Sequence, residues 1–252
     1  MTSGPVVLTL SPDSFPGLAD RLRELAVPVE ERPLLSFAPP ADWSPVDRAL
    51  SRMGWYDALA FTSPRAAAAF FGRRRRLGSG SKREQDALPP IWTTGRGTAA
   101  ALAPLAVATR GAPEDETGRI GAAAALAAAM LEAGVEGPVL FPCGELRRDE
   151  LPTRLRHEGL EVDEVVCYRS VLADEAAARA AADRAAILVV ASPSVADLLA
   201  RASLVGERPP MLAVGPTTAA AARASGWAPA AVAARPDIEA LVAGVRSLVA
   251  AG

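Results

Sequence analysis

The sequence contains few of the residues from which most metal and disulfide sites are built. Its 252 residues include two cysteines, Cys143 and Cys167, and one histidine, His157. Two cysteines are too few for a disulfide framework, and a Cys/His metal site needs three or four ligands. We therefore expect no metal site and a reducing, cytoplasmic environment. His157 stands among charged residues, so we expect it on the surface.

Long hydrophobic runs and an excess of charge are also missing. No apolar run reaches the roughly 18 residues of a membrane-spanning helix, and residues 1–10 lack the basic and apolar regions of a signal peptide. Lys and Arg number 27 and Asp and Glu 29, for a net charge of −2. Such a balance does not favour nucleic acid or membrane partners.

The common nucleotide and hydrolase motifs do not occur. There is no Gly-x-Gly-x-x-Gly, no Walker A sequence and no Gly-x-Ser-x-Gly. Each of these motifs forms a specific phosphate loop or nucleophile turn. Their absence argues against standard dinucleotide, NTP and α/β-hydrolase sites.

The sequence does contain an internal duplication. The segments that begin at Leu18, Phe61 and Pro89 recur in the same order at Leu151, Val190 and Pro209, with separations of 133, 129 and 120 residues. Periods of this length indicate a repeated domain and not a short solenoid unit. We therefore expect two similar lobes.

Short apolar runs alternate with longer Ala-, Leu- and Arg-rich stretches, which predicts β and α elements in turn. The predicted strands are 6–10, 34–38, 58–62, 91–94, 107–109, 139–141, 165–168, 187–191, 211–214 and 231–234. The predicted helices are 14–25, 45–53, 64–76, 98–105, 120–133, 149–158, 174–184, 193–202, 217–224 and 237–249. This order predicts an α/β fold with parallel sheets. Residues 73–86 read as a flexible loop, and their four arginines lack the aromatic residues of a nucleic-acid patch.

Paired strand-to-helix junctions are the candidate ligand sites, because ligands bind at the carboxyl ends of parallel strands. Ser63 and Ser192 each precede a proline after an apolar strand. They serve as helix N-caps or as donors to a ligand anion, and both readings stay open. The second pair is Gly95-x-x-Thr98 and Gly215-x-x-Thr218, where glycine permits a tight turn.

A third junction follows the strand 139–141. Arg147 and Arg148 lie there close to Gly144, and arginine binds carboxylates bidentately. A solvated arginine pair is an equally good interpretation. Cys143 is a weak candidate nucleophile because no base accompanies it. Tyr168 ends an apolar run, where a packing role is commoner than an acid role.

Together these motifs resemble the uroporphyrinogen-III synthase family over nearly the whole chain. The motifs are Phe61-Thr-Ser63, Gly95-x-x-Thr98-Ala, Val139-Leu-Phe-Pro-x-Gly-Glu145, Val165-x-x-Tyr-Arg169, Ala191-Ser-Pro-Ser194 and Gly215-Pro-Thr-Thr-Ala219. The resemblance implies two flavodoxin-like parallel-sheet domains joined by a two-stranded linker. Domain 1 would be discontinuous, with residues 1–34 plus 171–252, and domain 2 would comprise residues 38–166. The linker segments would lie near 34–38 and 166–171.

The resemblance also implies a reaction without a cofactor. Hydroxymethylbilane, a linear tetrapyrrole carboxylate, would lose water and close to uroporphyrinogen III with inversion of its last pyrrole ring. Tyr168 would assist the departing hydroxyl. The residues implied for substrate binding are Thr62, Ser63, Gly95, Thr98, Gly144, Arg147, Ser192, Ser194, Gly215 and Thr218. Cys143 departs from the family pattern, which often has a basic residue there.

The resemblance further implies a monomer that receives its substrate from the preceding enzyme of the pathway. A second hypothesis from another class is a non-catalytic, two-lobed anion-binding or regulatory module with the same fold. Formation of the type III isomer from hydroxymethylbilane distinguishes the two hypotheses.

Overall fold

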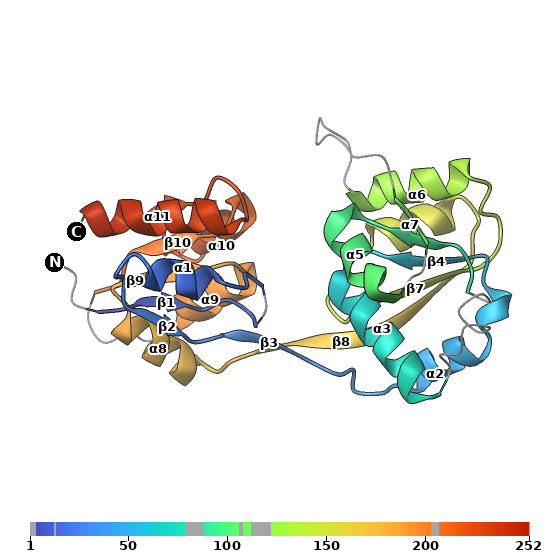
Figure 1. Ribbon diagram of the computed structural model, residues 1–252, viewed down its shortest axis with the longest axis horizontal. Coiled ribbons are helices and arrows are strands. Elements are labelled where there is room, and N and C mark those ends of the chain that lie inside the picture. Colours follow the sequence, from blue (N-terminus) through green and yellow to red (C-terminus); the bar gives the residue numbers. More distant parts are fainter. Residues whose placement is uncertain are drawn as a thin grey trace. The chain divides into compact units, whose positions relative to one another are not determined.

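A computed structural model describes residues 4–12, 14–78, 88–105, 108–111, 122–202 and 207–251. The chain forms two compact units. Unit 1 comprises Met1–Phe37 and Val171–Gly252, and unit 2 comprises Ala38–Ser170. Unit 1 is therefore discontinuous in sequence, with the N-terminal segment and the C-terminal third in one body (Figure 1). Each unit is a parallel sheet between helices, so the predicted α/β fold class is confirmed.

Unit 1 is built on a five-stranded sheet in the order β11-β10-β9-β1-β2, with parallel pairing throughout. The strands are β1 (Val6–Leu8), β2 (Val29–Glu31), β9 (Ile187–Val190), β10 (Met211–Ala213) and β11 (Ala231–Val232). The helices are α1 (Leu18–Arg23), α8 (Glu175–Arg184), α9 (Pro193–Arg201), α10 (Pro216–Ala224) and α11 (Ile238–Ala251). In chain order the strands lie 2-1-3-4-5, which is the flavodoxin-like arrangement.

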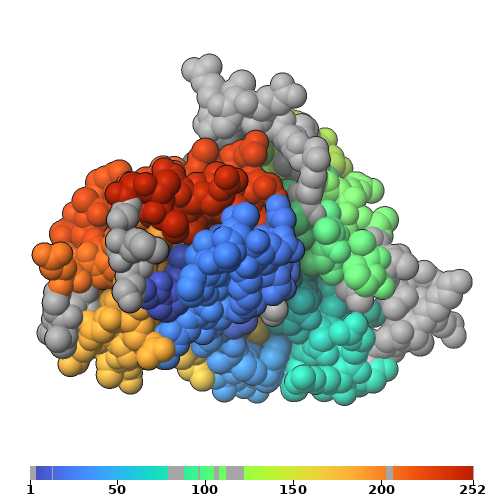
Figure 2. Space-filling view, turned by 60° about the vertical axis from the view of Figure 1, so that its left-hand side comes forward, coloured from blue at the N-terminus to red at the C-terminus, as the bar shows by residue number. Residues whose placement is uncertain are grey.

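Both faces of the unit 1 sheet are buried, as the continuous apolar runs predict. Val6 and Leu8 pack with α1 and α11 on one face, whereas Val7 packs with α8 and α9 on the other. Figure 2 shows α11, in red, lying along α1, in blue. The two ends of the sequence thus share one apolar core.

Unit 2 holds the second sheet, in the order β3-β8-β7-β4-β5-β6. Its strands are β4 (Ala58–Phe61), β5 (Ile91–Thr93), β6 (Thr109–Gly111), β7 (Val139–Gly144) and most of β8 (Val162–Leu172). The strand β3 (Leu35–Ala38) pairs with β8, but only Ala38 of it belongs to unit 2. One face packs against α2 (Ser44–Ser51), α3 (Pro64–Arg76) and α5 (Gly95–Leu102), and the other against α6 (Ala122–Glu132) and α7 (Glu150–His157). Two 3-10 turns, Met53–Trp55 and Ala103–Leu105, complete the described elements.

The two sheets repeat one another strand by strand. Val6 pairs with Val29 in unit 1, and Val139 pairs with Val162 in unit 2, each partner displaced by 133 residues. The neighbouring pairs of the two sheets are Leu188–Met211 and Leu59–Ile91, which agree with the separations of 129 and 120 residues. The internal repeat of the sequence therefore corresponds to equivalent strand pairs, with equivalent residues opposite one another, in the two sheets. Strands β7, β8, β4, β5 and β6 stand where β1, β2, β9, β10 and β11 stand in unit 1.

Several element boundaries differ from the sequence predictions. Residues 29–31 form the edge strand β2, which was not predicted because it is short and carries two glutamates. The predicted strand 165–168 is the middle of an 11-residue strand, β8. Helix α5 starts at Gly95, three residues before the predicted start. Val107, residues 79–86 of the predicted loop and residues 120–121 of a predicted helix lie outside the described residues.

Residues 73–76 were included both in a predicted helix, 64–76, and in a predicted loop, 73–86, and the structure places them in the last turn of α3. Arg73 donates from Nε and Nη2 to the two carboxylate oxygens of Asp47, at 2.7 and 2.6 Å. Its guanidinium also lies 5.2 Å from the ring centre of Trp43. The Arg73 hydrogen bond lowers the pKa of Asp47. Arg73 thus joins α3 to α2, which a run of four like charges does not reveal.

Candidate active site

The carboxyl edge of the unit 2 sheet contains a cavity of about 310 Å³. It lies at the ends of β7 and β4, which are neighbours in the sheet. The next strand of the chain lies on the outer side of each, with β8 beside β7 and β5 beside β4, so the strand order reverses between β7 and β4. Ligands of open α/β sheets bind at such a switch point. The cavity is lined from the ends of β4, β5 and β7, from the middle of β8, and from α6 and α7. The residues from the strands and the turns after them are Thr62, Ser63, Thr94, Cys143, Gly144, Arg147, Arg148 and Tyr168.

Tyr168 reaches this cavity because Gly144 has no side chain. The strand β8 has a register irregularity against β7, and Gly144 pairs there with Tyr168. A Cβ atom at Gly144 would lie 2.6 Å from Cζ and 2.7 Å from Oη of Tyr168. The ring crosses the glycine, and its Oη lies 3.3 Å from Oγ of Ser63. The glycine thus lets a phenol from the next strand enter the switch point.

Ser63 has two roles that the sequence left as alternatives. It is the N-cap of α3, and its Oγ accepts a hydrogen bond from the Ala66 amide at 3.3 Å. Pro64 follows at the first helical position, where its fixed φ suits a helix start. The same Oγ is within hydrogen-bond distance of Tyr168. The cap therefore also orients a group in the cavity.

The two arginines of the β7–α7 turn have different surroundings. Arg147 is ion-paired through Nε with Glu164, which also accepts a bond from Nη1 of Arg156 at 2.7 Å. Burial raises the pKa of Glu164, but the hydrogen bonds from Arg147 and Arg156 outweigh it, so the net pKa is lowered. Among the described residues the structure records no ion pair for Arg148. Arg148 is thus the cation available to an anionic ligand.

Replacing Glu164 by glutamine should destabilise the fold by about 2 kcal/mol at pH 7, as expected for a lost charge-assisted hydrogen-bond pair. Because the folded-state pKa of Glu164 is lowered, its stabilisation is complete above the unfolded value of 4.5 and is lost as the pH falls through the lower folded value. Urea unfolding of both proteins between pH 7 and pH 3 measures this. A difference in stability that does not shrink with acidification would contradict the assignment.

Cys143 is buried and does not have the properties of a nucleophile. The residue is 2% exposed, and its Sγ lies 3.7 Å from the Val165 carbonyl oxygen. Burial raises the pKa of this thiol to about 12. The weak nucleophile interpretation is therefore not supported, since a thiol with a pKa of about 12 is almost fully protonated at neutral pH.

We expect Cys143→Ser to keep turnover within about threefold of wild type, because the thiol is a packing group. Native protein should react slowly with a disulfide reagent at pH 8, whereas unfolded protein should yield both thiols. If Cys143→Ser loses turnover while its unfolding midpoint is unchanged, the Cys143 thiol takes part in the reaction.

A second pocket, of about 370 Å³, lies at the matching place in unit 1, where β1 and β9 end. We call it the unit 1 pocket; Leu10, Ser11, Leu35, Ser192 and Val214 are among its lining residues. Ser192 is the N-cap residue of α9, but its side chain makes no capping hydrogen bond. Its hydroxyl thus differs from that of Ser63.

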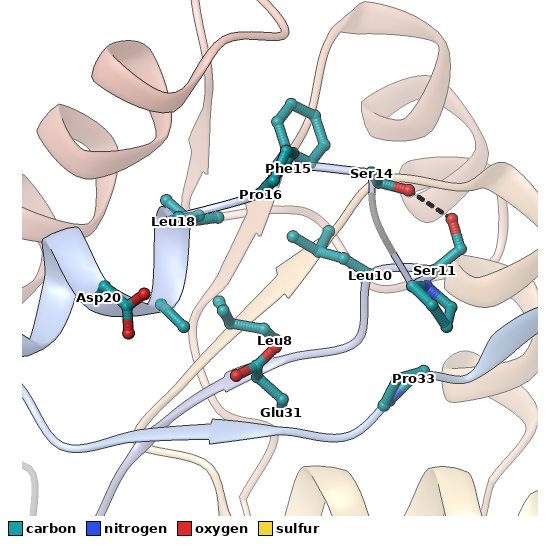
Figure 3. Close-up of a pocket in the computed structure, with 13 residues that line it drawn as sticks. Leu8, Leu10, Ser11, Ser14, Phe15, Pro16, Leu18, Asp20, Glu31 and Pro33 are labelled. Atoms are coloured by element: carbon teal, nitrogen blue, oxygen red, sulfur yellow. Dashed lines mark hydrogen bonds between the residues drawn. The ribbon is translucent and has the colours of Figure 1, made fainter. Parts of the chain in front are cut away.

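A third cavity, of about 310 Å³, adjoins the β1–α1 turn of unit 1 (Figure 3). The Ser11 and Ser14 hydroxyls face each other and are hydrogen-bonded, and the Asp20 and Glu31 carboxylates lie away from them (Figure 3). Both carboxylates accept bonds from Arg23. A cavity bordered by paired carboxylates does not attract an anion, so we do not assign the carboxylate ligand to it.

The structure brings some predicted residues together and leaves others out. Thr62, Ser63, Gly144, Arg147 and Tyr168 line the candidate active site, and Ser192 lines the unit 1 pocket. The predicted site residues that line neither cavity are Gly95, Thr98, Ser194, Gly215 and Thr218. Their binding roles remain predictions.

The Gly-x-x-Thr turns prove to be helix starts. Gly95 and Gly215 have φ values of 63° and 85°, in the left-handed region that glycine tolerates. Thr98 and Thr218 lie inside α5 and α10, are 4% and 2% exposed, and neither helix has a side-chain cap bond. The glycine requirement is thus explained, and neither threonine caps its helix.

Sequence reasoning missed Thr94 as a lining residue, and it considered Arg148 only as a member of the arginine pair at the third junction. Thr94 directly precedes Gly95 at the end of β5, and Arg148 neighbours Arg147. Thr94 could have been found by choosing the last residue of the predicted strand, and not the glycine that begins the motif after it. In the described part of the chain, no group of three His, Cys, Asp or Glu side chains is placed to hold a metal ion. No helix among those residues is long and apolar enough to cross a bilayer. His157 is exposed, as predicted.

Two solved structures share this fold at low sequence identity. A mutant uroporphyrinogen III synthase of the extremely thermophilic bacterium Thermus thermophilus matches with a TM-score of 0.65 and 14% identity, covering 99% of this chain and 100% of the other. The uroporphyrinogen-III synthetase of Helicobacter pylori 26695 matches with a TM-score of 0.62 and 19% identity, covering 97% and 99%. No curated protein sequence matches significantly.

The family comparison covers most of the sequence. The family described as uroporphyrinogen-III synthase HemD matches residues 17–243. This range includes both copies of the duplication and every described residue that lines the candidate active site. The chain therefore belongs to the uroporphyrinogen-III synthase family.

Proposed function

We propose that this enzyme of tetrapyrrole biosynthesis is a uroporphyrinogen-III synthase, a cyclising hydro-lyase that converts hydroxymethylbilane into uroporphyrinogen III. Family membership supports the proposal. The observation that carries it is the phenol of Tyr168, which crosses Gly144 into a cavity at a sheet switch point. A proton donor there, beside arginine, suits a substrate that carries carboxylates and a departing hydroxyl.

Substrate carboxylates would bind the cationic side of this cavity. Arg148 supplies a positive charge without a recorded ion pair among the described residues, whereas the charge of the neighbouring Arg147 is paired with Glu164. The 13-residue helix α3 starts at the cavity, so its N-terminal amides and partial positive charge face the same volume. This arrangement would hold the linear chain in a folded conformation, which lowers the entropic barrier to ring closure.

Tyr168 would act on the departing hydroxyl. The carbon–oxygen bond breaks with its electron pair going to oxygen, which takes a proton from the phenol and leaves as water. The pyrrole nitrogen supplies electron density to the carbon left behind. Ser63, at 3.3 Å, stabilises the phenolate by hydrogen bonding. The phenolate regains a proton when the attacked ring loses one.

The enzyme would work as a cytoplasmic monomer that receives hydroxymethylbilane from the enzyme that makes it. A fast hand-over matters, because the free linear tetrapyrrole closes spontaneously to the type I isomer. Both cysteines are unpaired and buried, which is compatible with a reducing compartment.

The test supplies enzymatically generated hydroxymethylbilane to the purified protein and separates the uroporphyrin isomers after oxidation. We expect mainly isomer III, with isomer I as the product of a reaction without protein. Isomer I alone would reject the enzyme and leave the non-catalytic anion-binding module as the better reading. Equilibrium binding of uroporphyrin III, followed by its fluorescence, would then measure that module directly.

A further inference from the structure

An acidic residue lies directly behind one arginine of the candidate active site. Glu164 is on β8, is not among the described residues that line the cavity, and has a side chain that is 14% exposed. Its carboxylate accepts a hydrogen bond from Nε of Arg147 and is ion-paired with Nη1 of Arg156 at 2.7 Å. Arg156 also donates from Nη2 to the Val162 carbonyl oxygen, at 2.8 Å. Glu164 is thus held on its strand, and Arg147 reaches it from the turn that borders the cavity.

Glu164 is ionised at neutral pH, so it neutralises positive charge beside the site. Burial raises the pKa of Glu164, but the hydrogen bonds from Arg147 and Arg156 outweigh it, and the net pKa is lowered. A carboxylate of a bound ligand presents the same kind of oxygen atoms to a guanidinium. Ligand and Glu164 therefore compete for the positive charge of Arg147, even where they contact different nitrogen atoms.

Arg147 and Arg148 should consequently contribute unequally to binding. Both line the cavity, but no ion pair is recorded for Arg148 within the described part of the chain. Arg147 is paired with Glu164, and its Nη2 also lies 3.7 Å from the exposed carboxylate of Asp149. If Arg147 turned to a ligand, Glu164 would lose one of its two arginines while most of its side chain stayed buried, which costs free energy. That cost weakens the binding of an anion.

We propose that Glu164 competes with a substrate carboxylate for Arg147 and thereby limits the affinity of the candidate active site for its anionic ligands. The inference rests on the proposed function, because the carboxylates belong to hydroxymethylbilane. Glu164 acts through Arg147 and is a positioning residue. Ring closure removes only water, so the product keeps the carboxylates of the substrate. A competitor that weakens both complexes alike raises KM and favours release of the product.

The first test is Glu164→Gln in the full-length protein, which removes the charge and keeps the length of the side chain. We expect KM for hydroxymethylbilane to fall about threefold to tenfold, the range for one charge-assisted contact at a partly exposed arginine. The dissociation constant of uroporphyrin III, followed by its fluorescence, should fall likewise, and kcat should not rise. The same substitution lowers stability, so a purely structural role of Glu164 would instead raise KM.

The double variant Arg147→Gln/Glu164→Gln identifies the group through which Glu164 acts. Its KM should return at least to the wild-type value, because the guanidinium that Glu164→Gln releases is then missing. Added salt should reduce the gain seen in Glu164→Gln, since it screens contacts between exposed charges. If the double variant keeps the lowered KM, Arg147 does not transmit the effect and the inference is wrong.

Asp163→Asn is the matched control. Asp163 is the neighbouring residue of β8, and its side chain points to the opposite face of the sheet, as successive strand residues do. It is bound there by Arg52 and, at 2.7 Å, by Tyr56. This change removes the same charge from the same strand, and KM should stay within about twofold. An equal fall of KM in both variants would assign the effect to net charge and overturn the competition for Arg147.

Circular dichroism reports folding, and Glu164→Thr, a neutral residue that suits a strand, serves for the same measurements if Glu164→Gln does not fold. An unchanged or raised KM, with an unchanged or raised dissociation constant of uroporphyrin III, overturns the inference. Failure of the proposed function looks different, because the wild-type protein itself would then produce isomer I alone. The uroporphyrin III titration would still compare Glu164→Gln with the wild type in that case.

Discussion

Turnover of hydroxymethylbilane is expected to fall about 10²–10³-fold in Tyr168→Phe, the range for loss of a positioned general acid. The change removes one oxygen, the atom that lies 3.3 Å from Ser63. The ring itself packs against the core of unit 2 and is kept. Binding of uroporphyrin III should therefore weaken by less than about threefold. Single-turnover kinetics and fluorescence titration measure the two quantities.

Tyr56→Phe is the matched control, since Tyr56 is the only other tyrosine of the sequence. Its Oη donates to Asp163 at 2.7 Å, and burial raises its pKa to about 12. Loss of that buried hydrogen bond should cost about 1 kcal/mol of stability, while turnover stays within about twofold. If Tyr168→Phe turns over at the wild-type rate, Tyr168 has no part in the chemistry.

Gly144→Ala is expected to lower turnover about 10²-fold and to leave the free energy of unfolding within about 1 kcal/mol. A methyl group at this position would overlap Cζ, Oη and Cε2 of Tyr168, at 2.6, 2.7 and 2.9 Å. These atoms are the far end of the Tyr168 side chain, so the ring can shift while the backbone stays in place. Displacing a reacting group by about 1 Å can lower a rate 10²-fold, which is why activity falls more than stability.

The double variant Gly144→Ala/Tyr168→Phe tests this explanation. If glycine acts through the phenol, the double variant should be no slower than Tyr168→Phe, because the two changes remove the same interaction. Gly72→Ala is the control. Apart from its chain neighbours and the backbone of its own helix, no described atom lies within 4 Å of an added Cβ, and the change should stabilise α3 by up to about 1 kcal/mol. If the two substitutions instead lower turnover independently, so that their effects multiply in the double variant, Gly144 contacts the substrate directly.

The fold was largely predictable because its signals are local. Apolar runs buried on both faces, such as Ala58–Phe61, indicate parallel strands without any tertiary information. Ser63-Pro64 locates the start of α3 to the residue. The short edge strand Val29–Glu31 was missed because an edge strand with glutamates has no apolar signal. The ion pair of Arg73 was not predicted, because its partner Asp47 lies on another helix, α2.

The location of the candidate active site was predictable from the sequence, whereas the residues that meet in it were less so. Ser63, Gly144 and Tyr168 each stood out as residues at strand ends. Their mutual contact depends on the register of β8 against β7, including the irregularity beside Gly144, and no local pattern encodes it. The buried positions of Thr98 and Thr218 depend likewise on how α5 and α10 pack.

The sequence by itself determined the duplication, the α/β class and the strand ends that border the cavities, because these depend on periodicity and on residues close in the chain. The tertiary structure decided which of the two equivalent cavities is lined by a phenol and arginines and which has no charged residue among its described lining residues. It also showed that Gly144 serves as the space through which Tyr168 passes. Such contacts join residues from different strands, so their geometry exists only once the sheet has formed.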